Sequence, residues 1–117
     1  MSHQIDLSYL IDITGGENDI MIEMIDIFLS ESEVVIQNLS EHYQAGDYQK
    51  LGAEAHKLKP TLLYVGLKDL HETTQQLETH AKAGSNQEHY ETWIGEITSV
   101  YASIKGDLQK EKERLLS

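Results

Sequence analysis

Cysteine is absent from the sequence, and proline, phenylalanine and tryptophan each occur once. Without cysteine, the chain can form neither a disulfide framework nor a thiolate metal site. No stretch approaches the roughly 20 apolar residues that a membrane-spanning helix needs, and no basic segment followed by an apolar run opens the chain. We therefore expect a cytoplasmic protein without a membrane partner. The single proline and the lack of a glycine-rich linker favour a helical domain.

Positive charge is missing from the first part of the chain. The formal net charge is -11, no lysine or arginine precedes Lys50, and ten carboxylates lie between Asp6 and Asp47. Because binding to a phosphate backbone needs a broad basic face, this distribution argues against a nucleic-acid partner. We interpret the acidic stretch as a solvated face, and steering of a partner is the alternative.

Apolar residues recur at helical spacing along most of the chain, and short connections between long helices favour antiparallel neighbours. The sequence therefore predicts an all-α fold, an antiparallel four-helix bundle with a short N-terminal helix that covers one end. We expect a single domain over residues 1–117, since this length leaves no room for a second. The predicted helices span 5–13, about 18–43 with a site for a bend near 30–32, about 48–65 with Asp47 as N-cap, about 68–83, and about 86 to the C-terminal end.

One histidine lies away from the apolar side of its own predicted helix, in the stretch 53–67 with the sequence AEAHKLKPTLLYVGL. At roughly 100° per residue, His56 is roughly 120–140° from the centre of the core-facing stripe, so it points to solvent. Spacings of four, three, four and three residues define that stripe. It comprises Leu51, Ala55, Leu58, Leu62 and Val65.

The surroundings of His56 are basic in an otherwise acidic protein. Residues 50–68 contain four lysines and a single acid, Glu54. Lys59 follows His56 by three residues, so on a helix its ammonium can reach the space beside the imidazole. Gly52, one turn earlier, leaves the ring uncovered. A neutral imidazole nitrogen is a nucleophile, and a neighbouring lysine can balance the negative charge of a phosphoryl group.

The run from His56 to Gly66, HKLKPTLLYVG, resembles the signature of histidine-containing phosphotransfer (HPt) domains. In that signature a phosphorylatable histidine is followed by a hydrophobic residue at the second position, lysine at the third, a small residue at the fourth and glycine near the tenth. The upstream stretches GGENDIMIEMIDIFLSE and AGDYQKLGAEAHKLK are also similar to the family, so the resemblance covers roughly residues 7–78 in register. Pro60 departs from it, because the family usually has glycine there. Proline lacks the N–H that would bond the carbonyl of His56, tends to kink a helix, and adds bulk beside a docking surface.

The resemblance implies a phosphorelay carrier that has neither an ATP site nor kinase activity. His56 would accept a phosphoryl group on Nε2 from the aspartyl phosphate of a receiver domain and pass it to another receiver, with Lys59 as electrostatic support. The implied partners are receiver domains of response regulators or hybrid histidine kinases, and the chain is expected to be a monomer. It needs no cofactor or metal of its own, because Mg²⁺ is expected on the receiver. The docking surface would include Gly52, Lys57, Pro60 and Leu63.

A reading from a different class stays open, in which the chain is a non-catalytic helical interaction module and His56 is an incidental surface residue. The sequence leaves open whether the chain is free-standing or the tail of a larger sensor kinase; its initial methionine favours the former. The other histidines do not suggest a metal site, because His71, His80 and His89 are nine residues apart and would alternate sides of a helix. We expect His3 and His42 at the surface. Core or half-buried packing is expected of Tyr43, Tyr90, Trp93 and Tyr101.

Overall fold

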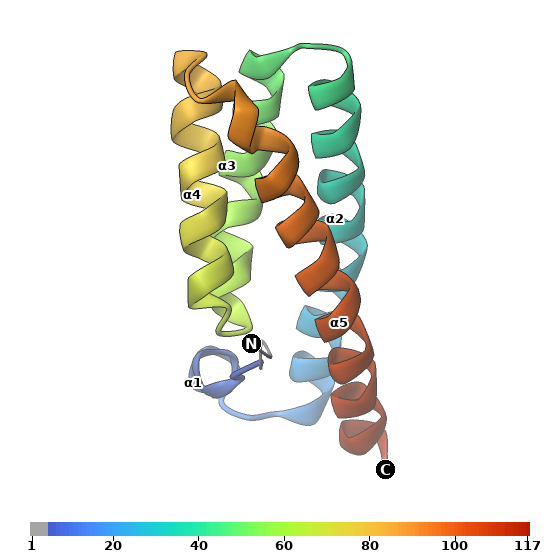
Figure 1. Ribbon diagram of the computed structural model, residues 1–117. Coiled ribbons are helices and arrows are strands. Elements are labelled where there is room, and N and C mark those ends of the chain that lie inside the picture. Colours follow the sequence, from blue (N-terminus) through green and yellow to red (C-terminus); the bar gives the residue numbers. More distant parts are fainter. Residues whose placement is uncertain (1–4) are drawn as a thin grey trace.

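The computed structural model describes residues 5–117, so the prediction for His3 lies outside the described part of the chain. Its elements are helical throughout this range, which confirms the predicted all-α bundle (Figure 1). Because α2 and α5 are long, the molecule is elongated, with principal extents of 46 × 24 × 20 Å. The elements are α1 (Ser8–Thr14), α2 (Asn18–Gln44), α3 (Tyr48–Tyr64), α4 (Lys68–Ala83), the 3₁₀ turn η1 (Gln87–His89) and α5 (Tyr90–Leu116).

The four long helices alternate in direction, each antiparallel to the next (Figure 1). Around the bundle, α2 contacts α3, α3 contacts α4, α4 contacts α5, and α5 closes the ring against α2. The short helix α1 lies across the end where α2 begins and α3 ends, as predicted (Figure 1). The helix α2 continues without interruption through residues 30–32. Among residues 5–117, no helix is long and apolar enough to cross a bilayer.

Local signals in the sequence set the ends of α3. The Asp47 carboxylate accepts a hydrogen bond of 3.2 Å from the backbone N–H of Lys50, which confirms the predicted N-cap. After α3 the chain turns at Gly66, whose φ of 76° favours glycine. The turn also receives the segment before α1, since the backbone N–H of Asp6 donates to the Val65 carbonyl at 2.9 Å. A Cβ at Gly66 would lie only 2.5 Å from the Cβ of Asp6, so a side chain here would displace this segment.

The core lies between the four long helices, on the faces that periodicity predicts. The stripe of α3 is at most 1% exposed at each of its five positions. Tyr90 and Tyr101 are buried, and the Tyr101 hydroxyl donates to the Leu29 carbonyl at 2.8 Å. Trp93 and Tyr43 are half-buried, as expected, and His42, which is expected at the surface, is half-buried as well. Because the inner face of α3 is packed into the core, polar side chains that could bind or react lie on its outer face or on its two flanks.

Candidate functional site

His56 lies on the outer face of α3, where sequence periodicity predicts it. Its side chain is 65% exposed, and the ring nitrogen Nδ1 is 2.7 Å from Oε2 of Glu78 on the neighbouring helix α4. The ring is therefore held from one side only. Its other nitrogen, Nε2, is on the side of the ring remote from this bond.

Glu78 is the centre of a polar cluster between α3 and α4. Its side chain is only 9% exposed, yet it accepts from three groups: His56, the Lys59 ammonium at 2.7 Å and the Lys82 ammonium at 3.0 Å. Burial alone would raise the pKa of Glu78, but the hydrogen bonds from Lys59, Lys82 and His56 outweigh it and lower the pKa from 4.5 to about 2. We call these four residues the Glu78 cluster.

The ionised state of Glu78 fixes the tautomer of His56. A carboxylate without a proton can only accept hydrogen bonds, so the Nδ1 atom at 2.7 Å must be the donor. In a neutral imidazole with its proton on Nδ1, the lone pair available for chemistry is on Nε2. The cluster thus presents a nucleophilic nitrogen toward solvent and holds the ring in one orientation.

Lys59 holds Glu78 from a largely buried position rather than from solvent. Its side chain is 19% exposed, and its ammonium donates to Oε1 of Glu78 and to Oε1 of Gln75, both at 2.7 Å. The sequence places Lys59 beside the imidazole, and the structure adds that the lysine acts on the ring through Glu78. Lys82 shares Oε2 of Glu78 with His56 and is 48% exposed, so it is the more accessible of the two cations.

The expectation that Gly52 leaves the ring uncovered and forms part of an exposed surface needs correction, because Gly52 is buried. A Cβ at this position would lie 2.7 Å from Cγ of Lys82 and 3.3 Å from its backbone nitrogen. Glycine is needed here because α3 and α4 approach each other closely. The Lys82 side chain packs against α3 at this point, and its ammonium reaches Glu78 because the two residues are one turn apart on α4.

The other residues predicted for docking are exposed on α3. Pro60 lies on the surface, and α3 continues through it to Tyr64. Leu63 is 40% exposed, and both residues border a hollow of about 580 Å³ between α1 and α3. At the α1 side of this hollow, Tyr9 stacks on Tyr64 with ring centroids 5.6 Å apart. Lys57 is exposed and forms an ion pair of 3.3 Å with Glu54.

Sequence reasoning missed Gln75, Glu78 and Lys82, the residues that α4 contributes. They are spaced three and four apart, so they share one side of α4. That side is next to the buried positions Leu77 and Ala81, and a glutamate beside a core stripe is the one signal that the sequence offered.

Comparison with known proteins agrees with this geometry. Residues 23–111 match the family model described as the Hpt domain, and no curated protein matches the chain. A similar solved structure is the crystal structure of histidine-containing phosphotransfer protein B (HptB) from Pseudomonas aeruginosa PAO1. It aligns with a TM-score of 0.85 and 25% sequence identity over 95% of this chain and 96% of that chain. The family model covers most of the chain, and the chain belongs to the Hpt domain family.

Proposed function

We propose that this protein is a phosphorelay carrier in two-component signalling, and that His56 is its phosphoacceptor. The observation that carries the proposal is the bond between His56 Nδ1 and Glu78, which leaves Nε2 as the nucleophilic atom of an exposed ring. The partners would be the receiver domains of response regulators or hybrid histidine kinases. The chain would hold no nucleotide, and the receiver would supply the Mg²⁺.

The transfer would consist of one displacement at phosphorus. Nε2 of His56 attacks the phosphoryl group of a receiver's aspartyl phosphate, a P–N bond forms, and the P–O bond to the aspartate breaks. The bonding electrons leave with the aspartate, which becomes a free carboxylate. The proton on Nδ1 stays in place while the ring becomes positively charged, and Glu78, 2.7 Å away, stabilises that charge. The reverse displacement passes the group to a second receiver.

The lysines of the cluster would have separate tasks. Lys59 is largely buried and bonds both Glu78 and Gln75, so it keeps the carboxylate ionised and in position. Lys82 is half exposed and contacts the same carboxylate oxygen as His56, so it can face the phosphoryl oxygens as negative charge arrives. The electrostatic support expected of Lys59 alone would thus be divided between two residues.

Docking would bring the receiver onto the exposed outer face of α3. Pro60 and Leu63 follow His56 by one and two helical turns and lie on the same side of the helix. Lys57 borders this face, while Gly52 would contribute by admitting Lys82. Pro60 would add apolar area to the contact where the family usually has glycine.

The experiment is phosphoryl transfer from a phosphorylated receiver domain in the presence of Mg²⁺. The chain should acquire a radiolabel that is labile in acid and stable in base, as expected of a phosphohistidine, and His56→Gln should lose it. His89→Gln is the matched control, because His89 is also exposed but lies at the start of α5. If His56→Gln accepts as much label as the parent, His56 is not the acceptor. If the parent accepts none from any receiver, the carrier function itself is wrong.

A further inference from the structure

Pro60 changes the backbone hydrogen bonding of α3 at the turn that carries His56. Proline has no backbone N–H, and inside a helix its ring also crowds the carbonyl of the residue four positions earlier. That carbonyl belongs to His56, so the bond that position 60 would normally donate to it cannot form. The helix nevertheless continues through Pro60 to Tyr64. The carbonyl oxygen of His56 therefore lacks its regular helical donor.

This carbonyl lies on the outer face of α3. His56 and Pro60 are both exposed and are one helical turn apart, whereas the apolar stripe of α3 faces the core. A helical carbonyl points along the axis toward the next turn, so the oxygen of His56 lies between these two side chains. On the solvent side of a helix, carbonyls also tilt outward. A molecule that docks on this face would meet the oxygen beside the imidazole.

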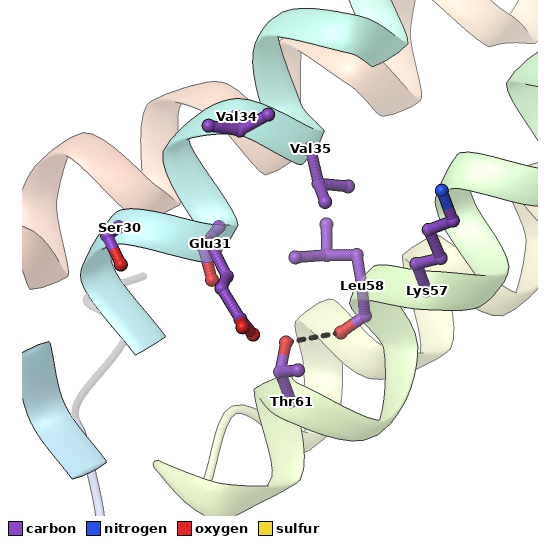
Figure 2. A pocket seen from close by; sticks show the side chains of 8 residues that line it. Ser30, Glu31, Val34, Val35, Lys57, Leu58 and Thr61 are labelled. Atoms are coloured by element: carbon purple, nitrogen blue, oxygen red, sulfur yellow. Dashed lines mark hydrogen bonds between the residues drawn. The ribbon is translucent and has the colours of Figure 1, made fainter. Parts of the chain in front are cut away.

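The polar side chains on either side of Pro60 have other partners. Thr61 lies on the flank toward α2, where its Oγ1 donates to the Leu58 carbonyl at 2.7 Å (Figure 2). Lys59 lies on the flank toward α4, where its ammonium donates to Glu78 at 2.7 Å. Neither neighbour replaces the donor that proline removes.

An unpaired carbonyl on a docking surface discriminates between partners. In the free chain water can bond to it, and a donor on the partner replaces that bond with little net gain. An apolar group placed against it would remove the water without replacing the bond, which is unfavourable. A site of this kind therefore rejects partners that lack the matching donor.

We propose that the His56 carbonyl selects receiver domains that place an uncharged hydrogen-bond donor, a side-chain amide or hydroxyl, against it. Pro60 would determine this specificity because it frees the acceptor. An additional lysine or arginine is disfavoured, since Lys57 and Lys82 are already exposed on the two sides of this face. The inference rests on the proposed function, because a receiver must dock beside His56 to reach the carbonyl.

The test is a double-mutant cycle with a receiver domain that transfers its phosphoryl group to this chain in the presence of Mg²⁺. Outside the receiver's own phosphorylation site, each serine, threonine, asparagine, glutamine, lysine and arginine whose signals shift on binding is changed to alanine. With the parent chain, one serine, threonine, asparagine or glutamine variant should raise KM about tenfold at nearly unchanged kcat. With Pro60→Ala the same receiver variant should raise KM by no more than about twofold, because the restored N–H already bonds the carbonyl.

Two further variants of the chain serve as controls. Pro60→Val restores the N–H and keeps a branched apolar side chain, so it should lose the coupling as Pro60→Ala does. Both variants should also raise the urea midpoint of unfolding, because proline is the least favourable residue inside a helix. Gly95→Ala should raise that midpoint as well and leave KM unchanged, since Gly95 is exposed on α5 and no atom lies within 4 Å of a Cβ there.

A spectroscopic measurement follows the carbonyl itself. Binding of the unphosphorylated receiver should shift the ¹³C carbonyl signal of His56 in the parent, and should shift it less in Pro60→Ala. An unchanged signal in the parent would mean that the receiver makes no bond to this oxygen, and the inference would be wrong.

The cycle has other outcomes that would overturn the inference. They are equal KM changes with the parent and Pro60→Ala at every position, coupling only at a lysine or arginine, and coupling that Pro60→Val retains. Each of these can occur while transfer to the parent is normal, and the proposed function would then stand. If no receiver transfers to the parent, the proposed function and this inference are both wrong.

Discussion

The two flanks of α3 differ in how closely they are packed and in whether their polar groups are paired. Toward α4, the carboxylate of Glu78 receives hydrogen bonds from three side chains, and the helices are close enough that only glycine fits at position 52. Toward α2, the helices leave an apolar hollow, and Ser32 Oγ and Glu54 Oε2 are buried without hydrogen-bond partners in the described residues. The α4 flank is thus complete within the chain, whereas the α2 flank keeps apolar space and two unpaired polar atoms among the described residues.

This difference matters because His56 takes its orientation from the complete flank. A ring that is 65% exposed would rotate freely without a fixed partner, and Glu78 supplies one at 2.7 Å. Glu78 is itself fixed by two lysines, so the imidazole of His56 is oriented within the chain alone. On the α2 flank, the buried Ser32 hydroxyl has no such partner among the described residues.

The largest effect that we predict is a loss of stability in acid that originates at Glu78. Its pKa in the folded chain is lowered from 4.5 to about 2, so the unfolded chain takes up this proton first as the pH falls. The stabilisation is therefore present above about pH 4.5 and is lost as the pH falls toward 2. It amounts to about 2 kcal/mol of unfolding free energy by pH 3 and about 3 kcal/mol over the whole window.

Urea unfolding of the parent and of Glu78→Gln at a series of pH values between about 3 and 6 measures this contribution. The difference between the two curves should shrink as the pH falls, because the other carboxylates cancel in the subtraction. Parallel curves would mean that Glu78 does not hold its low pKa in the folded chain.

The next effect concerns the tautomer of His56 and therefore phosphoryl transfer. In Glu78→Gln the amide can donate to Nδ1, which lets the proton move to Nε2 and removes the nucleophilic lone pair. Transfer from a phosphorylated receiver should slow by about 10- to 100-fold, the loss typical when the partner that orients a histidine is changed. Imidazole ¹⁵N shifts of the labelled chain should report the tautomer directly.

The exposed acid Glu72, also on α4, provides the matched control. Glu72→Gln should leave both the tautomer and the transfer rate as they are in the parent. A tautomer that changes in Glu78→Gln without any loss of rate would separate orientation of the ring from catalysis.

Most of the fold follows from short-range patterns in the sequence. The stripe from Leu51 to Val65 marks the buried face of α3, and Asp47 and Gly66 mark its ends, because caps and periodicity depend on neighbours within one helix. The exposure of His56 follows from the same phase. These signals need no knowledge of any other helix.

The partners of His56 could not be found in that way, because they depend on how α3 and α4 are aligned along their lengths. Glu78 is 22 residues from His56, and helical phase alone does not say which turn of α4 meets which turn of α3. For the same reason the expected place of the Lys59 ammonium, beside the imidazole, is only part of the answer, since the position of Glu78 decides where the ammonium lies. Gly52 looked like an uncovered patch because the approach of Lys82 is visible only in the packed bundle.

A smaller effect should separate the two lysines of the Glu78 cluster. Both donate to Glu78, but Lys59 is 19% exposed and also bonds Gln75, whereas Lys82 is 48% exposed. Lys59→Ala should lower the unfolding free energy by about 1–2 kcal/mol, because it leaves a buried carboxylate with fewer partners. Lys82→Ala should lower it by less than about 1 kcal/mol, as is usual for a solvated ion pair.

Urea denaturation of the two variants at neutral pH gives these values, and the transfer assay gives a second comparison. If Lys82 faces the phosphoryl group, its variant should lose transfer rate out of proportion to its loss of stability. Equal changes in stability and rate in both variants would leave no distinction between a positioning lysine and an exposed one.

The smallest effect tests whether the complete flank depends on the close approach at Gly52. Alanine in the middle of a helix normally stabilises it by about 0.5–1 kcal/mol relative to glycine, and Gly95→Ala should show this gain, since no atom lies within 4 Å of a Cβ there. Gly52→Ala should instead lower the unfolding free energy by about 1 kcal/mol, because the new methyl group would lie 2.7 Å from Lys82 Cγ and 3.3 Å from the Lys82 nitrogen. The same displacement would move Lys82 away from Glu78, so a small loss of transfer rate should accompany it. If both glycine variants gain stability equally, Lys82 can move aside freely, and the cluster around His56 is held by Lys59 and Glu78 without help from the spacing of the helices.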